Sequence, residues 1–153
     1  MSDLDPLVRH EMMAALMTAA ADHGTTVVIA SHVLAELEGS CDYLLLIGDG
    51  RVRLAGEVED LVSAHRLVMG RYEDTGTPRE FAAHTVVESR TTGRQLTALL
   101  RTDGPVAGHW EVAEPSLEEL LLAHLRSPDV PPLLAPSAEP RSYVGKAKAG
   151  VAA

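Results

Sequence analysis

The chain has 153 residues, a formal net charge of −9 and 46% hydrophobic residues, so it can bury a core but has no room for two large domains. The acidic balance excludes the basic surface that binds nucleic acid or anionic lipid, and no nucleic-acid partner is expected. The single cysteine, Cys41, cannot form an internal disulfide and fits a reducing, cytoplasmic compartment. No apolar run approaches the roughly 20 residues that span a bilayer, so any membrane association is expected to come through a partner.

The first predicted element is a helix that begins at Pro6. Asp5 can accept a hydrogen bond from the exposed amides of a first helical turn, and proline is tolerated at the first helical position. Apolar residues then recur at helical spacing up to Gly24, which suits the residue just past a helix end. Residues 25–32 (TTVVIASH) form an apolar, β-branched run that turns polar at its end. This pattern predicts a strand buried on both faces of a parallel sheet.

The next segments alternate between helix and strand patterns. Residues 33–39 (VLAELEG) predict a short helix that ends at its glycine, and residues 43–47 (YLLLI) predict another buried strand. The Gly-Asp-Gly turn at residues 48–50 leads into residues 51–57, the second arm of a hairpin. Residues 57–65 predict a further short helix. The order favours an α/β fold in which helices cover a sheet.

The sequence changes in character at residue 66. Short alternating segments, separated by Gly, Thr and Pro turns, predict a small α+β module. The module ends in a leucine-rich helix, because Ser116 can cap it and Glu119 is placed to complete a capping box. Later residues are rich in Pro, Ala and Ser, with too little patterned apolar surface to offset the entropy of ordering. We therefore expect an α/β part over residues 1–65, the α+β module over 66–126 and a disordered tail over 127–153.

His32 is the first candidate functional residue. It directly follows a predicted strand, and open α/β folds bind their ligands at the carboxyl ends of parallel strands. The competing structural explanation is that His32 caps the next helix or bonds to neighbouring backbone. Asp5 likewise has a sufficient structural role as a helix cap, worth roughly 1 kcal/mol, and Ser2 has one as part of a frayed terminus.

The remaining histidines lack the spacing of metal ligands. His10 and Glu11 begin a sequence like the HExxH zinc motif, but Ala14 stands where the second histidine must be, so we predict no metal site. Trp110 is a candidate platform for a ligand, although a single tryptophan is more often a core anchor. The other histidines are interpreted as solvated or packing residues: His23, His65, His84, His109 and His124.

Several of these segments together resemble the last third of the ATP-binding subunit of an ABC transporter. The matching stretches, in order and spacing, are SDLDP with the helix after it, TTVVIASH, LAELEG, DYLLLIGDGRV and LAGEVEDL. They cover residues 1 to about 64 and imply the C-terminal part of a P-loop NTPase core, with parallel strands and covering helices. EPSLEELLLAHL is similar to the helix that often ends the C-terminal extension of subunits serving drug-efflux, ABC-2-like exporters. That likeness implies export.

The resemblance also implies roles for three residues. Residues 2–6 correspond to the D-loop, which in the family reaches across a nucleotide-sandwich dimer. Ser2 and Asp5 would then lie at the contact with a second ATP-binding subunit. His32 corresponds to the switch histidine of the H-loop, which contacts the γ-phosphate of ATP, so it is the expected catalytic and cofactor-binding residue. Asp3 departs from the glycine or alanine that is common in the family.

The resemblance further implies parts that these residues do not contain. In the family the D-loop follows an Asp-Glu-Pro sequence, so Met1 would be an interior position, and we expect a wrongly assigned start or a truncated gene. The sequence has no Walker A, signature or Walker B motif, and such parts hold ATP and Mg2+ in a complete domain. One histidine bonded to a charged phosphate contributes about 1.5–3 kcal/mol, whereas millimolar binding needs about 4 kcal/mol. We expect no ATP hydrolysis by the isolated chain.

Two main hypotheses of function follow. In the first, the chain is part of a subunit that couples ATP hydrolysis to export, with a second such subunit and a membrane permease at the cytoplasmic face. Strands near residues 27–30 and 44–47 then lack their neighbours, and exposed apolar edges are expected. In the second, the chain is a non-catalytic interaction or regulatory protein whose module at residues 66–126 docks a partner. A third hypothesis, a small-ligand sensor in that module, rests on Trp110.

Overall fold

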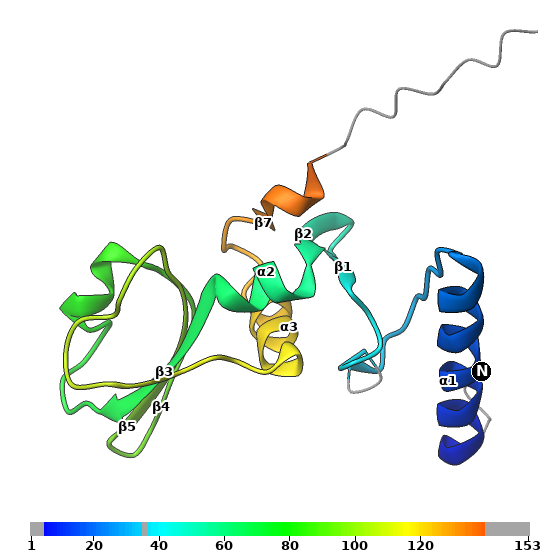
Figure 1. Cartoon of the computed structure of the whole chain (residues 1–153). Helices are drawn as coiled ribbons and strands as arrows, with labels where there is room; N and C mark the ends of the chain where they lie inside the picture. The colour runs from blue at the N-terminus through cyan, green and yellow to red at the C-terminus, as the bar shows by residue number, and fades with distance from the viewer. Residues whose placement is uncertain (1–4, 35–36, 140–153) are drawn as a thin grey trace, which may run out of the picture.

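The computed structural model describes residues 5–34 and 37–139. Its strands form a three-stranded sheet in the order β1-β2-β7 and a four-stranded sheet in the order β4-β5-β3-β6. In Figure 1, helix α1 lies at one side of the molecule, the four-stranded sheet lies at the other, and α3 lies between them. None of the described helices is long and apolar enough to cross a membrane. The elements are α1 (Pro6–His23), β1 (Tyr43–Gly48), β2 (Arg51–Glu57), α2 (Val58–Ser63), β3 (His65–Arg71), η2 (Arg79–Ala83), β4 (Thr85–Thr92), β5 (Gln95–Arg101), β6 (Glu111–Ala113), α3 (Leu117–Arg126), β7 (Leu133–Leu134) and η3 (Pro136–Ala138).

Helix α1 begins and ends where the sequence predicts. The Asp5 carboxylate accepts a hydrogen bond from the amide of Leu7 at 2.8 Å, which confirms its capping role. Gly24 ends the helix in the left-handed conformation, with φ of 61°, which a residue with a side chain rarely adopts. None of the residues of α1 is buried, and Figure 1 shows the helix apart from both sheets. It therefore lacks the tertiary packing that normally stabilises an amphipathic helix.

The buried strand predicted at residues 25–32 is not formed. This segment has no regular secondary structure and belongs to neither sheet, and the Val28 side chain is 91% exposed. β-Branched residues favour a strand only where neighbouring strands pair with it and cover its side chains, and no segment within the described ranges does so. In the helix predicted at 33–39, residues 35–36 lie outside the described residues, and 37–40 form a turn.

Strands β1 and β2 form the predicted hairpin. Gly48 pairs with Arg51, so Asp49 and Gly50 make a two-residue turn, with φ values of 51° and 71°. Positive φ at both positions is the requirement of a type I′ turn, which matches the twist of the strands it joins. The helix predicted after the hairpin is also present, as α2.

The prediction that the first hairpin strand is buried on both faces is wrong. Leu44 and Leu46 are buried, whereas Leu45 and Ile47 are exposed, because only the face that joins the cluster with α3 is covered. The hairpin is antiparallel, and the only parallel pairing among the described strands joins two residues of β2 to β7. The parallel core implied by the resemblance is therefore present only in that short contact.

The predicted α+β module contains the four-stranded sheet, in which every pairing is antiparallel. One face packs around Phe81 of η2 and includes Trp110. The indole lies directly over Gly70, where an added Cβ would come within 2.5 Å of the ring. Trp110 is thus a core anchor, as the more common structural role of a single tryptophan predicts. The opposite face contributes Val87 and Leu99 to a second cluster, which includes α3.

Helix α3 confirms the predicted capping box. The Ser116 hydroxyl accepts from the Glu119 amide at 3.1 Å, and the Glu119 carboxylate accepts from the Ser116 amide at 2.8 Å. Leu117, Leu120 and Leu121 are buried in one cluster with residues of β1, β2, α2, β4 and β5. Since this cluster draws on both sheets, α3 is the element that holds them together.

The disorder predicted for residues 127–153 is wrong for residues 127–139, which have a defined structure. Arg53, which is buried in β2, donates hydrogen bonds to the carbonyl oxygens of Ser127 and Val130 at 2.9 and 2.8 Å. β7 then pairs with the same strand. Partners 74 or more residues earlier in the chain thus supply the order that the composition of this segment does not predict. Residues 140–153 of the predicted tail lie outside the described residues.

Candidate functional site

The structure does not gather the three candidate residues into one pocket. Ser2 lies outside the described residues. Asp5 is exposed at the start of α1, where its carboxylate bonds to the first helical turn. His32 is exposed in the connection between α1 and β1, and no hydrogen bond or ion pair in the described part of the chain joins it to Asp5. The sites proposed for these residues therefore need groups beyond those described.

The backbone around His32 turns directly after the apolar segment. The Ser31 hydroxyl accepts a hydrogen bond from the amide of Val33 at 3.0 Å, which is the local geometry of a serine turn. The imidazole of His32 is solvent-accessible and not packed into the core. It can therefore donate a hydrogen bond to an anion, although one such bond is too weak to hold a nucleotide.

Exposed apolar side chains are concentrated on both sides of His32 in the sequence. Within the described residues after β2, only three large apolar side chains are exposed: Val112, Leu125 and Leu134. Ten are exposed from α1 to the start of β2: Leu7, Val8, Met12, Leu16, Val28, Val33, Tyr43, Leu45, Ile47 and Val52. Such a concentration is typical of a surface that another protein segment covers.

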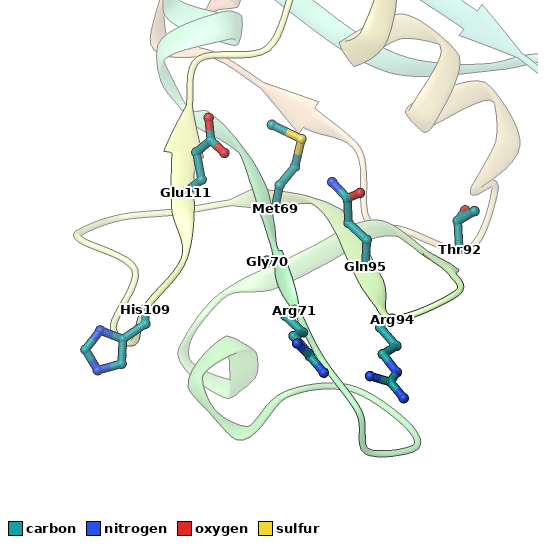
Figure 2. Close-up of a pocket in the computed structure, with 8 residues that line it drawn as sticks. All are labelled: Met69, Gly70, Arg71, Thr92, Arg94, Gln95, His109 and Glu111. Carbon is teal, nitrogen blue, oxygen red and sulfur yellow. The ribbon is translucent and has the colours of Figure 1, made fainter.

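A shallow, open hollow lies on the four-stranded sheet. Figure 2 shows the side chains of Arg71 and Arg94 extending to the same side of it. The Glu73 carboxylate lies 2.6 Å from the Arg71 guanidinium and 3.8 Å from that of Arg94, so it offsets much of their charge. Glu111 also lines the hollow, so two carboxylates balance the two arginines and no surplus of positive charge is left for phosphate binding. Its lining is Met69, Gly70, Arg71, Thr92, Arg94, Gln95, His109 and Glu111.

The structure also brings together two histidines that were predicted to be solvated or packing residues. His65 starts β3 and His124 lies in α3, and their exposed fractions are 0% and 1%. The two Nε2 atoms are 3.0 Å apart, and the rings meet edge to face at 85°. Nδ1 of His65 lies 2.6 Å from the carbonyl oxygen of Leu61. The two residues therefore form a buried hydrogen-bonded pair.

The geometry assigns the protons of this pair. A carbonyl oxygen only accepts, so His65 carries its hydrogen on Nδ1 and its Nε2 accepts the hydrogen on Nε2 of His124. Nδ1 of His124 is then bare, and it has no hydrogen-bond partner in the described part of the molecule. Burial lowers the pKa of both rings, and the charge of Arg101 lowers them further. The pKa of His124 falls to about 3, so both rings are neutral at pH 7.

Known proteins similar to this chain are transport ATP-binding subunits. The Thiamine import ATP-binding protein ThiQ of Vibrio parahaemolyticus is 31% identical over 64 residues, which are 42% of this chain and 27% of ThiQ. The Uncharacterized ABC transporter ATP-binding protein all4389 of Nostoc sp. is 30% identical over 90 residues, 58% of this chain and 27% of that protein. The Methionine import ATP-binding protein MetN of Clostridium acetobutylicum is 27% identical over 106 residues, 65% of this chain and 33% of MetN. This chain is similar to part of an ABC transporter ATP-binding subunit.

The matches support the ABC transporter resemblance in its general form. The chain spans only about a quarter to a third of the length of these ABC transporter relatives, from 27% to 33%. ThiQ and MetN are named as import proteins, so the drug-efflux type is not confirmed. No protein-family model matches the chain, and no solved structure matches it.

Proposed function

We propose that this chain supplies the C-terminal part of an ABC transporter ATP-binding subunit, in which His32 contacts the γ-phosphate of ATP. Ser2 and Asp5 belong to the loop that meets a second ATP-binding subunit. The similarity to ThiQ, all4389 and MetN supports the family. The observation that carries the proposal is the conflict at residues 25–32, where a sequence typical of a buried strand has no buried residue and Val28 is 91% exposed.

The conflict is resolved if further segments of the same subunit cover this region. Burial of apolar surface is favourable by about 25 cal/mol per Å2, and the exposed side chains of α1, residues 25–32 and β1 forgo that stabilisation. Strands placed on either side of residues 25–32 would pair its backbone and cover Val28. They would also hold His32 at the carboxyl end of a strand, where α/β sheets bind ligands. We propose that residues 1–65 act in this way, with residues 66–126 as a C-terminal extension.

His32 forms only one part of the proposed nucleotide site. ATP hydrolysis requires backbone amides around the phosphates, a lysine and Mg2+ to offset the developing charge, and these belong to the other part of the subunit. The contribution of this chain is one imidazole donor, and the exposure of His32 is compatible with that role. Because a single donor cannot hold ATP, we propose that the 153-residue chain alone is inactive.

We further propose that ATP hydrolysis is coupled to transport through a membrane permease, with the subunit at the cytoplasmic face. This chain itself does not enter the membrane. The export direction rests on the likeness of the α3 region to a helix of exporter subunits, whereas ThiQ and MetN are import proteins. A flux assay in vesicles of known orientation decides between the two directions.

The alternative function is a non-catalytic interaction protein built on residues 66–126. It is favoured by the separate apolar cluster of this module around Val68, Phe81 and Leu100. Such a protein would need neither His32 nor ATP. The two proposals therefore differ in what happens when His32 is replaced.

Replacing His32 by alanine is expected to reduce ATP hydrolysis by about 100-fold or more, the usual effect of losing one donor to a developing anion. The test uses the protein extended at Met1 by the codons that precede it in frame, with kcat and KM measured at saturating Mg2+. The loss should fall mainly on kcat, since other groups hold the nucleotide. His10→Ala, at an exposed position of α1, is the matched control and should keep full activity.

Three outcomes would contradict this proposal. One is ATP binding by the 153-residue chain at millimolar concentration, and another is an extended protein that hydrolyses ATP equally well with His32→Ala. The third is a stop codon directly before Met1 together with a soluble monomeric chain that binds one defined partner. The last outcome would support the interaction protein.

A further inference from the structure

The buried histidine pair lies at the contact between α3 and the rest of the molecule. His124 shares α3 with Leu120 and Leu121, which hold the two sheets together, and His65 joins α2 to β3. The hydrogen bond between the Nε2 atoms is a buried polar contact across this boundary, which the more exposed ion pair of Arg126 and Glu88 also crosses. A change in this bond therefore acts directly on the docking of α3.

The geometry of the pair opposes an added proton on either ring. A proton on Nε2 of His65 would face the hydrogen already on Nε2 of His124 across 3.0 Å, unless the hydrogen of His124 moves to its Nδ1. A proton on Nδ1 of His124 would be buried without an acceptor in the described part of the molecule. Each charged form loses a hydrogen bond or leaves a buried donor unpaired, and both are costly.

The surrounding charges oppose protonation as well. Arg101 of β5 acts on both rings, Arg66 of β3 acts on His65, and Arg53 of β2 acts on His124. All three are cations. Two acids on the elements packed against the pair are already engaged: Glu88 of β4 pairs with Arg126 at 3.5 Å, and Asp60 of α2 accepts from Ser137 at 2.8 Å.

The two histidines are not placed to bind a metal ion. Two imidazole nitrogens supply half of a tetrahedral set, and the described residues contain no group of three or more His, Cys, Asp or Glu side chains placed to hold a metal. The nearby arginines also repel a cation. A proton-dependent hydrogen bond explains the pair better than a metal centre does.

We propose that the His65–His124 pair is a pH-sensitive joint, which docks α3 when both rings are neutral and releases it as the solution becomes acidic. The inference does not depend on the proposed ABC transporter function, because it uses neither His32 nor Asp5. Release of α3 would separate the two sheets and expose the leucines between them. The fold thus contains an element whose position responds to protons.

The sign of the effect follows from the burial of the rings. A histidine in the released state has its ordinary pKa near 6.5, whereas burial lowers the pKa of both rings in the docked state. Docking is therefore fully favoured above pH 6.5 and weakens as the pH falls below it. Between pH 7.5 and pH 5, a ring that must lose its proton before α3 can dock lowers the docking equilibrium constant by about 30-fold. The factor applies once for each such ring.

Amide hydrogen exchange on the 153-residue chain tests this inference. From pH 7.5 to pH 5, after correction for intrinsic exchange, we expect the protection of Leu120 and Leu121 to fall by about 30-fold or more. The amides of Ala98 and Leu99 in β5 should lose clearly less, because release of α3 leaves the four-stranded sheet paired. The NMR signals of the His124 ring should not titrate near pH 6.5 while α3 is docked.

Two variants separate the joint from a general loss of stability. In His124→Gln the side-chain amide can still donate to Nε2 of His65 but does not titrate. The loss of amide protection in α3 between pH 7.5 and pH 5 should therefore be about 30-fold smaller than in the unaltered chain. His109→Gln, at an exposed loop position, should leave the loss unchanged. An equal loss in α3 and β5 would overturn the proposal, as would a His124 ring that titrates near pH 6.5 with α3 still protected. The titration needs only the unaltered chain, so it decides the question even if His124→Gln fails to fold.

Discussion

Replacing Leu120 by alanine is expected to lower the free energy of unfolding by about 2–5 kcal/mol, the usual cost of removing a buried leucine side chain. Leu120 is completely buried, and its cluster includes Leu54 of the hairpin and Leu99 of the four-stranded sheet. The cavity would therefore form where the two sheets meet. Neither sheet can move to fill it without disturbing its packing against the other. Urea unfolding followed by circular dichroism measures the change.

Leu125→Ala provides the matched control for this prediction. Leu125 lies in the same helix but is 44% exposed, so its replacement should change stability by less than about 0.5 kcal/mol. Equal effects of the two substitutions would mean that the buried leucines of α3 do not stabilise the contact between the two sheets.

The parts of the fold that the sequence predicts are those with local causes. Asp5 and Gly24 bound α1 through groups within one helical turn, and Ser116 with Glu119 starts α3 in the same way. The hairpin turn needs only two residues that tolerate positive φ. Each of these signals acts over four residues or fewer, so it does not depend on which distant segments pack nearby.

The parts that the sequence predicts wrongly depend on distant partners. Residues 25–32 have the composition of a buried strand but find no strand to pair with among the described residues. Residues 127–139 have the composition of a disordered tail, yet Arg53 and β2 provide hydrogen-bond partners for them. Composition describes what a segment would do in an average environment, whereas order depends on the particular neighbours it meets.

The candidate site shows the same division. The roles of His32 and Asp5 came from the resemblance to ABC transporter subunits and stay predictions, because the described residues do not complete their sites. The buried histidine pair was missed, since a separation of 59 residues carries no motif. One signal was present: His124 follows Leu117, Leu120 and Leu121 at the spacing of a single helix face, which places it in the core.

Replacing Gly56 by alanine is expected to destabilise the docked segment after α3 by about 2–4 kcal/mol. Gly56 has φ of 148°, which strains any residue with a side chain. The new Cβ would also lie 2.5 Å from the Cβ of Ala135 and 3.0 Å from the hydroxyl of Ser137. Such overpacking costs about 1–3 kcal/mol in addition to the backbone strain. Limited proteolysis within residues 128–139, together with urea unfolding, measures the change.

The cause of this loss can be divided by a second substitution. Ser137 accepts from the amide of Glu57 at 2.9 Å and donates to Asp60 at 2.8 Å, so moving the segment away from Gly56 breaks both bonds and the pairing of β7. Ala135→Gly in the Gly56→Ala background removes the facing Cβ and should restore part of the protease resistance. If the double variant recovers nothing, the loss comes from backbone strain and the remaining close contact with the Ser137 hydroxyl, not from the Cβ of Ala135. If Gly56→Ala is cleaved no faster than Gly104→Ala, whose added Cβ would meet no atom within 4 Å, the close packing at Gly56 does not hold the segment. Its order then depends on the hydrogen bonds that Arg53 donates to Ser127 and Val130 and Arg101 donates to Pro131.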